Sequence, residues 1–115
     1  MTSTETENVV RKHLETFLER KGIPAMLEDY DAAAPFYSAE RVYEGHGEIG
    51  EFFTAFLRSL PPGAYERFAL GSLSVHGELA FITWSVGTDI PLGTDTFLVR
   101  EGKIVSQTFA MYASR

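Results

Sequence analysis

One carboxylate in this sequence lies among apolar side chains. In the stretch GTDTFLVREGKIV, residues 93–105, strand alternation puts Asp95 on the same face as Phe97 and Val99, ahead of a tight turn. An unpaired charge on an apolar face is costly, because it loses its hydration. Burial there is expected to raise the pKa of the Asp95 carboxyl group, which suits a general acid or base near neutral pH. The alternative is a structural aspartate that accepts hydrogen bonds from amides of the loop 90–93.

A histidine on the first expected helix is the second candidate. His13 lies four residues after Val9 and four before Phe17, on the stripe that a helix would bury. If the ring reaches Asp95, the carboxylate would fix its tautomer and raise its basicity, and the two would form a pair that transfers protons. The alternative is a hydrogen-bonded histidine of the core.

Other residues are candidates for contacts with a ligand. Tyr37 could donate to a ligand oxygen, although a ring in the core with its hydroxyl at the rim is equally compatible. Strand parity predicts that a further set faces the helices together with Asp95: Phe81, Phe97, Gln107, Phe109 and Met111. Gln107 could orient a ligand, since a buried amide needs partners. The three histidines lack the spacing of metal ligands, so no metal and no cofactor is predicted.

Helical and strand patterns follow one another along the chain. Apolar residues recur at helical spacing in 5–21, 25–30 and 45–60. The segment 33–42 is expected to be irregular and partly extended. Four strands are predicted, over 65–75, 79–88, 94–100 and 103–112. Helices followed by an antiparallel meander indicate an α+β fold in which helices cover one face of a curved sheet.

The predicted strands are apolar on both faces, and three helices can cover only one of them. Trp84 has the opposite parity to Phe81 and is assigned to the outer face. A second copy of the chain is the simplest cover for that face. We therefore expect a homodimer through the outer sheet face, in which the contact residues are Ile82, Trp84, Val86, Leu98 and Tyr112.

Composition limits the possible partners. The 115 residues suffice for a single domain, residues 1–115. Ten basic and 16 acidic residues, without a basic cluster, argue against binding to nucleic acid. The chain has no cysteine, so it has neither disulfides nor a thiolate nucleophile. Residues 1–8 are polar and no run approaches the roughly 18 apolar residues of a membrane span, so a cytoplasmic location is expected.

Five segments, taken in order, resemble one known group of proteins. They are VVRKHLETFLERKG, DYDAAAPFYS, YEGHGEIGEFFTAFL, AFITWSVGT and DTFLVREGKIVSQTF. Their order and spacing are similar to the SnoaL-like branch of the nuclear transport factor 2-like (NTF2-like) superfamily, whose relatives include steroid delta-isomerase and the SnoaL polyketide cyclases. The resemblance implies a cone-shaped NTF2-like (cystatin-like) α+β fold. In such a fold N-terminal helices pack on a curved, mostly antiparallel sheet and enclose a pocket, often in a homodimer.

The resemblance also implies roles for single residues. In the steroid isomerases an aspartate base acts with a tyrosine and a protonated aspartic acid that hydrogen-bond the developing enolate. Asp95 lies where the protonated acid would lie, and His13 falls approximately at the tyrosine. The base corresponds to about Tyr37 or Ser38, neither of which is a carboxylate, and Phe53 replaces a supporting tyrosine. This pattern argues against steroid isomerisation. In SnoaL-type cyclases a pocket aspartate is thought to transfer protons, a role open to Asp95 with His13 as its partner.

Three functions follow as expectations. The first is a cofactor-independent enzyme of the isomerase or cyclase type, which binds a small apolar, carbonyl-bearing molecule in a conical pocket and transfers a proton with Asp95 and His13. The second is a non-catalytic module that binds a small ligand, and the third is a protein-interaction module with a filled cone. A cavity separates the third from the others. A direct contact between Asp95 and His13 separates the first from the second.

Overall fold

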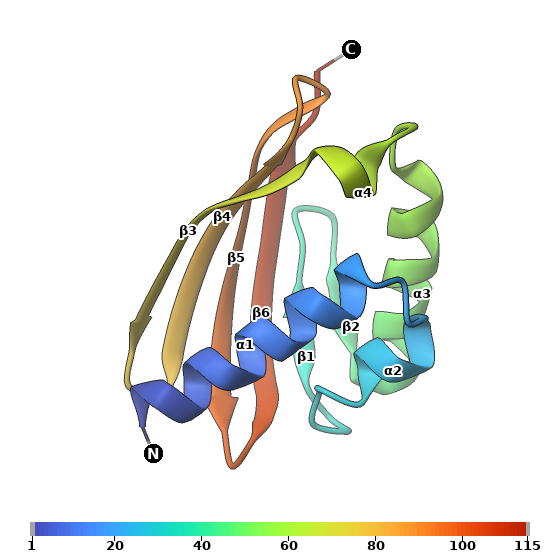
Figure 1. The fold of residues 1–115 in the computed structure, drawn as a ribbon. Coiled ribbons are helices and arrows are strands. Elements are labelled where there is room, and N and C mark those ends of the chain that lie inside the picture. Colours follow the sequence, from blue (N-terminus) through green and yellow to red (C-terminus); the bar gives the residue numbers. More distant parts are fainter. Residues whose placement is uncertain (1, 115) are drawn as a thin grey trace.

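The computed structural model describes residues 2–114, which fold into four helices and one six-stranded sheet (Figure 1). The helices are α1 (Ser3–Leu18), α2 (Ile23–Leu27), α3 (Gly45–Ser59) and α4 (Ala64–Arg67). The strands are β1 (Pro35–Tyr37), β2 (Val42–Glu44), β3 (Phe68–His76), β4 (Leu79–Val86), β5 (Ile90–Arg100) and β6 (Lys103–Tyr112). The predicted α+β class is confirmed.

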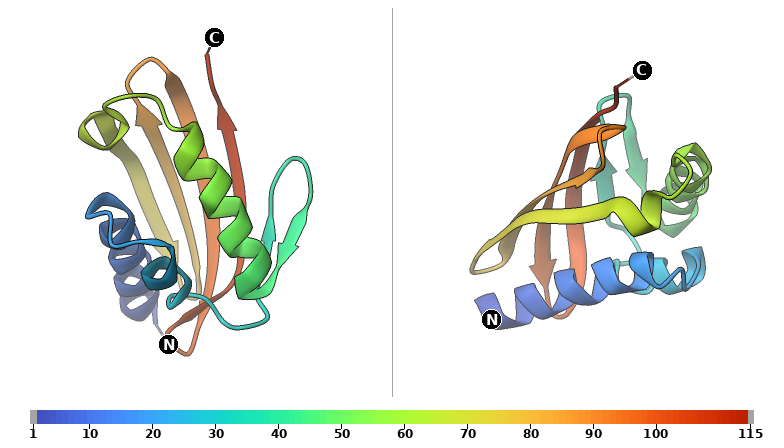
Figure 2. Two further views of the ribbon diagram at one scale, coloured as in Figure 1. Left: turned by 90° about the vertical axis from the view of Figure 1, so that its right-hand side faces the viewer. Right: turned by 45° about the horizontal axis from the view of Figure 1, so that its top comes forward.

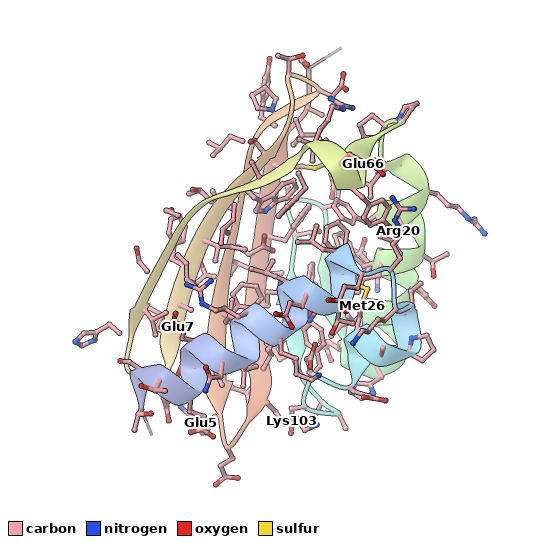
Figure 3. The ribbon with its side chains drawn as sticks, viewed as in Figure 1. Glu5, Glu7, Arg20, Met26, Glu66 and Lys103 are labelled. Atoms are coloured by element: carbon pink, nitrogen blue, oxygen red, sulfur yellow. The ribbon has the colours of Figure 1, made fainter. Side chains whose placement is uncertain are left out.

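Helix α1 presents His13 to the interior. The helix begins after Thr2, whose hydroxyl accepts a hydrogen bond from the first turn. The predicted range 5–21 extends too far, because Arg20 has a positive φ of 57° with which a helix cannot continue. Arg20 instead forms an ion pair with Glu66, with 3.1 Å between nitrogen and oxygen, and ties the end of α1 to α4 (Figure 3).

The sheet has two more strands than predicted. Its order is β2-β1-β6-β5-β4-β3, and every neighbouring pair is antiparallel except β1 with β6. The additional hairpin β1–β2 lies in and just beyond the segment 33–42. Phe36 of β1 pairs with Tyr43 on one side and with Gln107 on the other. The second partner is distant in sequence, so the local pattern could not reveal this pairing.

The bounds of β3, β4 and β5 also differ from the prediction. The segment 65–75 begins inside helix α4, and its strand starts only at Phe68. The segment 90–93 was expected to be a turn but belongs to β5. The chain reverses earlier, around Gly87 with its φ of 51°, and this lets Ile90 rejoin the sheet opposite the end of β4.

The helices and the sheet form two layers. Helices α1, α2 and α3 lie on one side of the curved sheet (Figures 1 and 2). In the left view of Figure 2, α3 runs in front of β5 and β6, while α1 packs against β3, β4 and β5. No described helix covers the opposite face of the sheet. None of the helices within residues 2–114 has the length and apolar character needed to cross a membrane.

The register of β4 reverses the predicted facing of that strand. Ile82 pairs with Asp95, and Phe81 pairs with Thr96. Residues directly opposite one another share a face of the sheet, so Ile82 lies inside and Phe81 outside. The buried residues of the strand are Ala80, Ile82, Trp84 and Val86. The predicted dimer contact is therefore wrong for Ile82, Trp84 and Val86, because all three face the helices.

Candidate functional site

A small apolar cavity lies between the helices and the covered face of the sheet. Its volume is about 60 Å³, and eight of the nine phenylalanines line it. Phe53, Phe97 and Phe109 are among them, as predicted. Met26 reaches the cavity from α2, where Figure 3 shows it between the helices. The side chains in its wall that carry charged or amide groups are His13, Asp95 and Gln107.

Asp95 faces the interior, as the strand alternation predicts, and is only 6% exposed. Its Oδ2 accepts the indole N–H of Trp84 at 2.8 Å, and its Oδ1 accepts the amide N–H of Gln107 at 2.9 Å. Burial raises the pKa of Asp95 from 3.8 to about 7, although these two hydrogen bonds act in the opposite direction. With a pKa in this range, the carboxyl group can take either protonation state near neutral pH. Side chains of neighbouring strands hold it, and the backbone amides of 90–93 do not.

Gly93 lets Trp84 reach Asp95. Trp84 and Gly93 are paired across β4 and β5, and the indole occupies the space that a side chain at position 93 would need. A Cβ atom at position 93 would lie 2.1 Å from Cε2 of the indole, a distance that no structure tolerates. The missing side chain thus provides the space in which Trp84 turns its N–H towards a carboxylate two residues further along the neighbouring strand.

His13 is buried, but it does not bond Asp95 directly. Its Nδ1 lies 2.8 Å from Oδ2 of Asp29, and its Nε2 lies 3.3 Å from the hydroxyl of Tyr30. The Tyr30 hydroxyl donates to Oε1 of Gln107, and Gln107 in turn donates to Asp95. The predicted direct contact is wrong: two side chains lie between His13 and Asp95 and join them in one hydrogen-bonded network.

The network reaches the surface through Lys12. Its ammonium group lies 2.6 Å from Oδ1 of Asp29, and its side chain is 60% exposed. The hydrogen bond with Asp29 raises the pKa of Lys12. Burial opposes ionisation of Asp29, but the hydrogen bonds from His13 and Lys12 outweigh it, so the pKa of Asp29 falls below its ordinary value. Asp29 is therefore a stable anion beneath a solvated cation.

Tyr30 and Asp29 were not among the candidates predicted from the sequence. Both follow α2, and the backbone holds them to β6: Asp29 accepts from the N–H of Ile104, and Asp31 donates to the carbonyl of Ile104. Tyr30 is 2% exposed, and its pKa is raised well above its ordinary value by burial and then by the charges of Asp95 and Asp29. The available signal was the DYD triplet itself, in which a tyrosine stands between two carboxylates.

Three predicted ligand contacts lie away from the cavity. Tyr37 is 45% exposed, because strand alternation buries its neighbour Phe36 instead. Phe81 is 41% exposed on the outer face, for the reason of register given above. Met111 is 39% exposed near the end of β6, beyond the part of the strand that lines the cavity. These three assignments are corrected, and Trp84 takes a place in the site.

The described residues offer no ready metal site. Among residues 2–114, no three His, Asp or Glu side chains gather as a set of metal ligands. Asp29 already holds Lys12 and His13, and Asp95 holds Trp84 and Gln107. Both carboxyl groups thus have their hydrogen-bond partners within the protein.

Comparison with solved structures places this geometry in a known fold. An NTF2-like protein of unknown function from Burkholderia xenovorans LB400 superposes with a TM-score of 0.78 over all of this chain and 88% of its own, at 16% identity. The chain has the NTF2-like fold. A SnoaL-like protein of unknown function from Burkholderia thailandensis E264 gives a TM-score of 0.76 over 98% of each chain, at 13% identity. The predicted resemblance in fold is confirmed.

A third similar structure belongs to a protein with a provisionally assigned activity. It is a provisionally assigned ketosteroid isomerase from Kribbella flavida DSM 17836, with a TM-score of 0.72, 16% identity, and coverage of 100% of this chain and 84% of its own. Compared by sequence, the chain matches no protein-family model and no curated protein. At these identities the likeness concerns the NTF2-like fold, and the site must supply the argument about function.

Proposed function

We propose that this NTF2-like chain binds a small, mainly apolar molecule that carries a carbonyl or similar oxygen, and that Asp95 exchanges a proton with it. The proposal depends chiefly on one observation. A carboxyl group with a pKa raised to about 7 stands in the wall of a mainly apolar cavity. Near neutral pH such a group can donate a proton as an acid and accept one as a carboxylate.

The size of the cavity limits the ligand. Its 60 Å³ is well below the roughly 150 Å³ that accommodates benzene in an engineered protein cavity. A molecule of a few non-hydrogen atoms fits the site as it stands, and a steroid does not. A larger ligand could enter with one end only, unless aromatic side chains rotate away.

The geometry also restricts the mechanism. Tyr37 and Ser38, at the position of the isomerase base, lie in an exposed segment and cannot act on a molecule in the cavity. Asp95 is thus the one carboxyl group that the described part of the cavity wall provides. The proton transfer that we propose uses this group twice: the carboxylate removes a proton next to the carbonyl, and the resulting acid returns one to the enolate.

Non-catalytic binding is the second candidate. Both oxygens of Asp95 already accept a hydrogen bond from the protein. A carboxyl group held in this way can position a ligand oxygen without exchanging protons with carbon. Catalysis requires in addition that a carbon-bound proton of the ligand comes within reach of the carboxylate.

Binding can be measured with Trp84, the only tryptophan of the chain, whose ring lines the cavity. Acetone is a suitable probe because it combines a carbonyl with a small apolar body, and isobutane is the matched compound without oxygen. We expect acetone to shift the Trp84 emission to saturation, with a weaker effect from isobutane. The Tyr37→Phe variant, altered outside the cavity, should bind like the wild type.

Catalysis is tested by exchange in D₂O. If Asp95 transfers protons, the protein accelerates the incorporation of deuterium into the methyl groups of acetone, followed by proton NMR. The Asp95→Asn variant should bind acetone and lose the acceleration, because the amide keeps the shape and gives up the titratable proton. Saturable binding without acceleration would favour the non-catalytic candidate, and absence of both would exclude the proposal for ligands of this class.

A further inference from the structure

The hydrogen bonds between Asp95 and His13 can run in two directions. When Asp95 is ionised, Gln107 donates to it, Tyr30 donates to Gln107, and the Tyr30 oxygen accepts from Nε2 of His13. Asp29 is an anion and accepts from Nδ1 of the same ring. Both ring nitrogens then carry a hydrogen, so His13 is an imidazolium.

The opposite direction appears when the proton moves to Asp95. The carboxyl O–H then donates to Oε1 of Gln107, whose amide has turned over within the same volume. The amide N–H donates to the Tyr30 oxygen, and the Tyr30 hydroxyl donates to Nε2 of a neutral His13. The bond from Nδ1 to Asp29 stays as it was. Every link again has one donor and one acceptor.

In both fully hydrogen-bonded arrangements, either the Asp95 carboxyl group or Nε2 of His13 is protonated, and the other is not. If Asp95 and His13 are both protonated, two donors face each other at one link. If neither is protonated, two acceptors do. Each of these states loses a hydrogen bond in a buried site, where such a loss is costly. The arrangement with one shared proton is therefore favoured over those with two or none.

We infer that Tyr30 and Gln107 are positioning residues that couple the protonation of Asp95 to that of His13, so that the cavity acid and the histidine share one proton over a wide range of pH. The net change is one proton lost from Nε2 of His13 and one gained by the Asp95 carboxylate, while the Tyr30 hydroxyl and the Gln107 amide keep their own hydrogens and only reverse the direction of their hydrogen bonds. The inference deepens the proposed function, on which its catalytic meaning rests. Its test needs no ligand.

The charged and titratable groups around this network come from several elements. Lys12 and His13 lie on α1, Asp29 and Tyr30 follow α2, and Asp95 is on β5. From α3, Nε2 of His46 lies 2.9 Å from the carbonyl of Tyr30. From β6, Lys103 donates to the carbonyl of Glu28, beside the same segment (Figure 3). The last two contacts are to the backbone, so they hold the segment without entering the chain of side-chain bonds.

Lys12 gives the network a connection to solvent. Its exposed ammonium holds Asp29 as an anion, and Asp29 holds the hydrogen on Nδ1 of His13. A change in the protonation of Asp95 therefore changes the protonation of His13, which Asp29 connects to the exposed Lys12.

NMR titration tests the coupling. The carboxyl ¹³C signal of Asp95, assigned by its absence in Asp95→Asn, and the ring ¹⁵N signals of His13 are followed from about pH 4 to about pH 9. In the wild type the Asp95 and His13 signals should both change in the same two titration steps, because each step belongs to the coupled pair and not to one residue. In Tyr30→Phe, which removes the connecting hydroxyl, each signal should show a single step of its own.

Two further variants complete the test. Tyr43→Phe is the matched control, because Tyr43 packs on Phe36 and Phe52 outside the network, and it should keep the two shared steps. Gln107→Leu breaks the neighbouring link and serves in place of Tyr30→Phe if that variant does not fold. Independent single steps in the wild type overturn the inference. Shared steps that survive in both Tyr30→Phe and Gln107→Leu overturn it as well, since the coupling would then act through space.

Discussion

The indole of Trp84 and the carboxylate of Asp95 meet across neighbouring strands, with 2.8 Å between Nε1 and Oδ2. The two residues are not directly paired: Trp84 is opposite Gly93, and Asp95 is opposite Ile82. The hydrogen bond is therefore diagonal, and it exists because Gly93 leaves room for the ring. The acid in the cavity wall thus depends on a residue that has no side chain.

Gly93→Ala should displace the indole and break this bond. The added Cβ would lie 2.1 Å from the ring, so we expect a loss of about 1–3 kcal/mol in the free energy of unfolding. Urea denaturation followed by Trp84 fluorescence measures it. Gly47→Ala is the control, because nothing lies within 4 Å of its Cβ and its place inside α3 favours alanine by about 0.5–1 kcal/mol. Equal stability of Gly93→Ala and the wild type would contradict the role of Gly93.

The raised pKa of Asp95 should make the protein less stable as the pH rises. Between the ordinary value of 3.8 and the folded value of about 7, the folded state holds a proton on Asp95 that the unfolded state releases. If Asp95 titrates alone, the free energy of unfolding then falls with pH over this window, by at most about 1.4 kcal/mol per pH unit. If Asp95 shares its proton with His13, as inferred above, the unfolded histidine also binds a proton up to about pH 6.5, and the fall is confined to higher pH. Asp29 affects the free energy of unfolding only at more acidic pH. Because its pKa is lowered in the folded protein, the stability that it contributes is lost as the pH falls through the acidic range.

The difference between the wild type and Asp95→Asn isolates this effect. Apart from His13, whose protonation we infer to depend on Asp95, the titrating groups are common to both proteins. A loss of stability of the wild type relative to the variant between pH 5 and pH 7 is expected if Asp95 titrates alone, and only above about pH 6.5 if it shares its proton with His13. Urea denaturation of both proteins at several pH values, followed by far-UV circular dichroism, gives the free energy of unfolding as a function of pH for each. Curves that stay parallel up to about pH 9 would show that Asp95 keeps an ordinary pKa in the folded protein.

Enlarging the cavity should widen the range of ligands. Phe56 lines the cavity and is only partly buried, so Phe56→Ala should cost about 2–4 kcal/mol of stability and leave the fold intact. We expect cyclopentanone to bind this variant more tightly than the wild type, measured by Trp84 fluorescence. Phe81→Ala makes the same chemical change on the outer face and should leave the affinity unchanged. A larger gain from Phe81→Ala would place the binding site elsewhere.

The homodimer remains a proposal, now with a different contact surface. The outward residues of β4, β5 and β6 include Leu79, Phe81, Thr96, Leu98 and Thr108, and the middle of this face carries no charged side chain. Depletion of charge is typical of the centre of an interface. We expect the wild type to sediment as a dimer at micromolar concentration and Phe81→Glu as a monomer. Leu18→Glu, on the end of α1, should stay dimeric, and a monomeric wild type excludes the proposal.

The local patterns revealed more of the fold than of the site. The ends of α3 and β6 and the inward position of Asp95 follow from helical spacing and strand alternation, which are properties of neighbouring residues. The facing of β4 was predicted wrongly, although Thr83 and Ser85 on one face, against Trp84 and Val86 on the other, already favoured the correct choice. The pairing of β1 with β6 could not be read, because its two strands lie far apart in the sequence.

The contact of His13 with Asp29 illustrates the same limit within the site. Sequence spacing indicates that His13 is buried, but it does not show which of the acidic residues the ring meets. That choice depends on the backbone of 29–31, which Ile104 holds against β6. Tyr30 reaches Gln107 for the same reason. A network whose links join three separate parts of the chain has no local signature.

The bridge between residues 29–31 and Ile104 also bears on the order of folding. Strands β3 to β6 form a meander whose contacts join neighbours in sequence, and such contacts form early, since they close short loops. The bond between Tyr30 and Gln107 spans 77 residues, and its partners come from opposite ends of the chain. An intermediate with a complete meander would therefore contain Asp95 and Trp84 in place and still lack the rest of the network. In such an intermediate the carboxylate would stay open to water until α1 and α3, whose side chains complete the cavity wall, dock on the sheet.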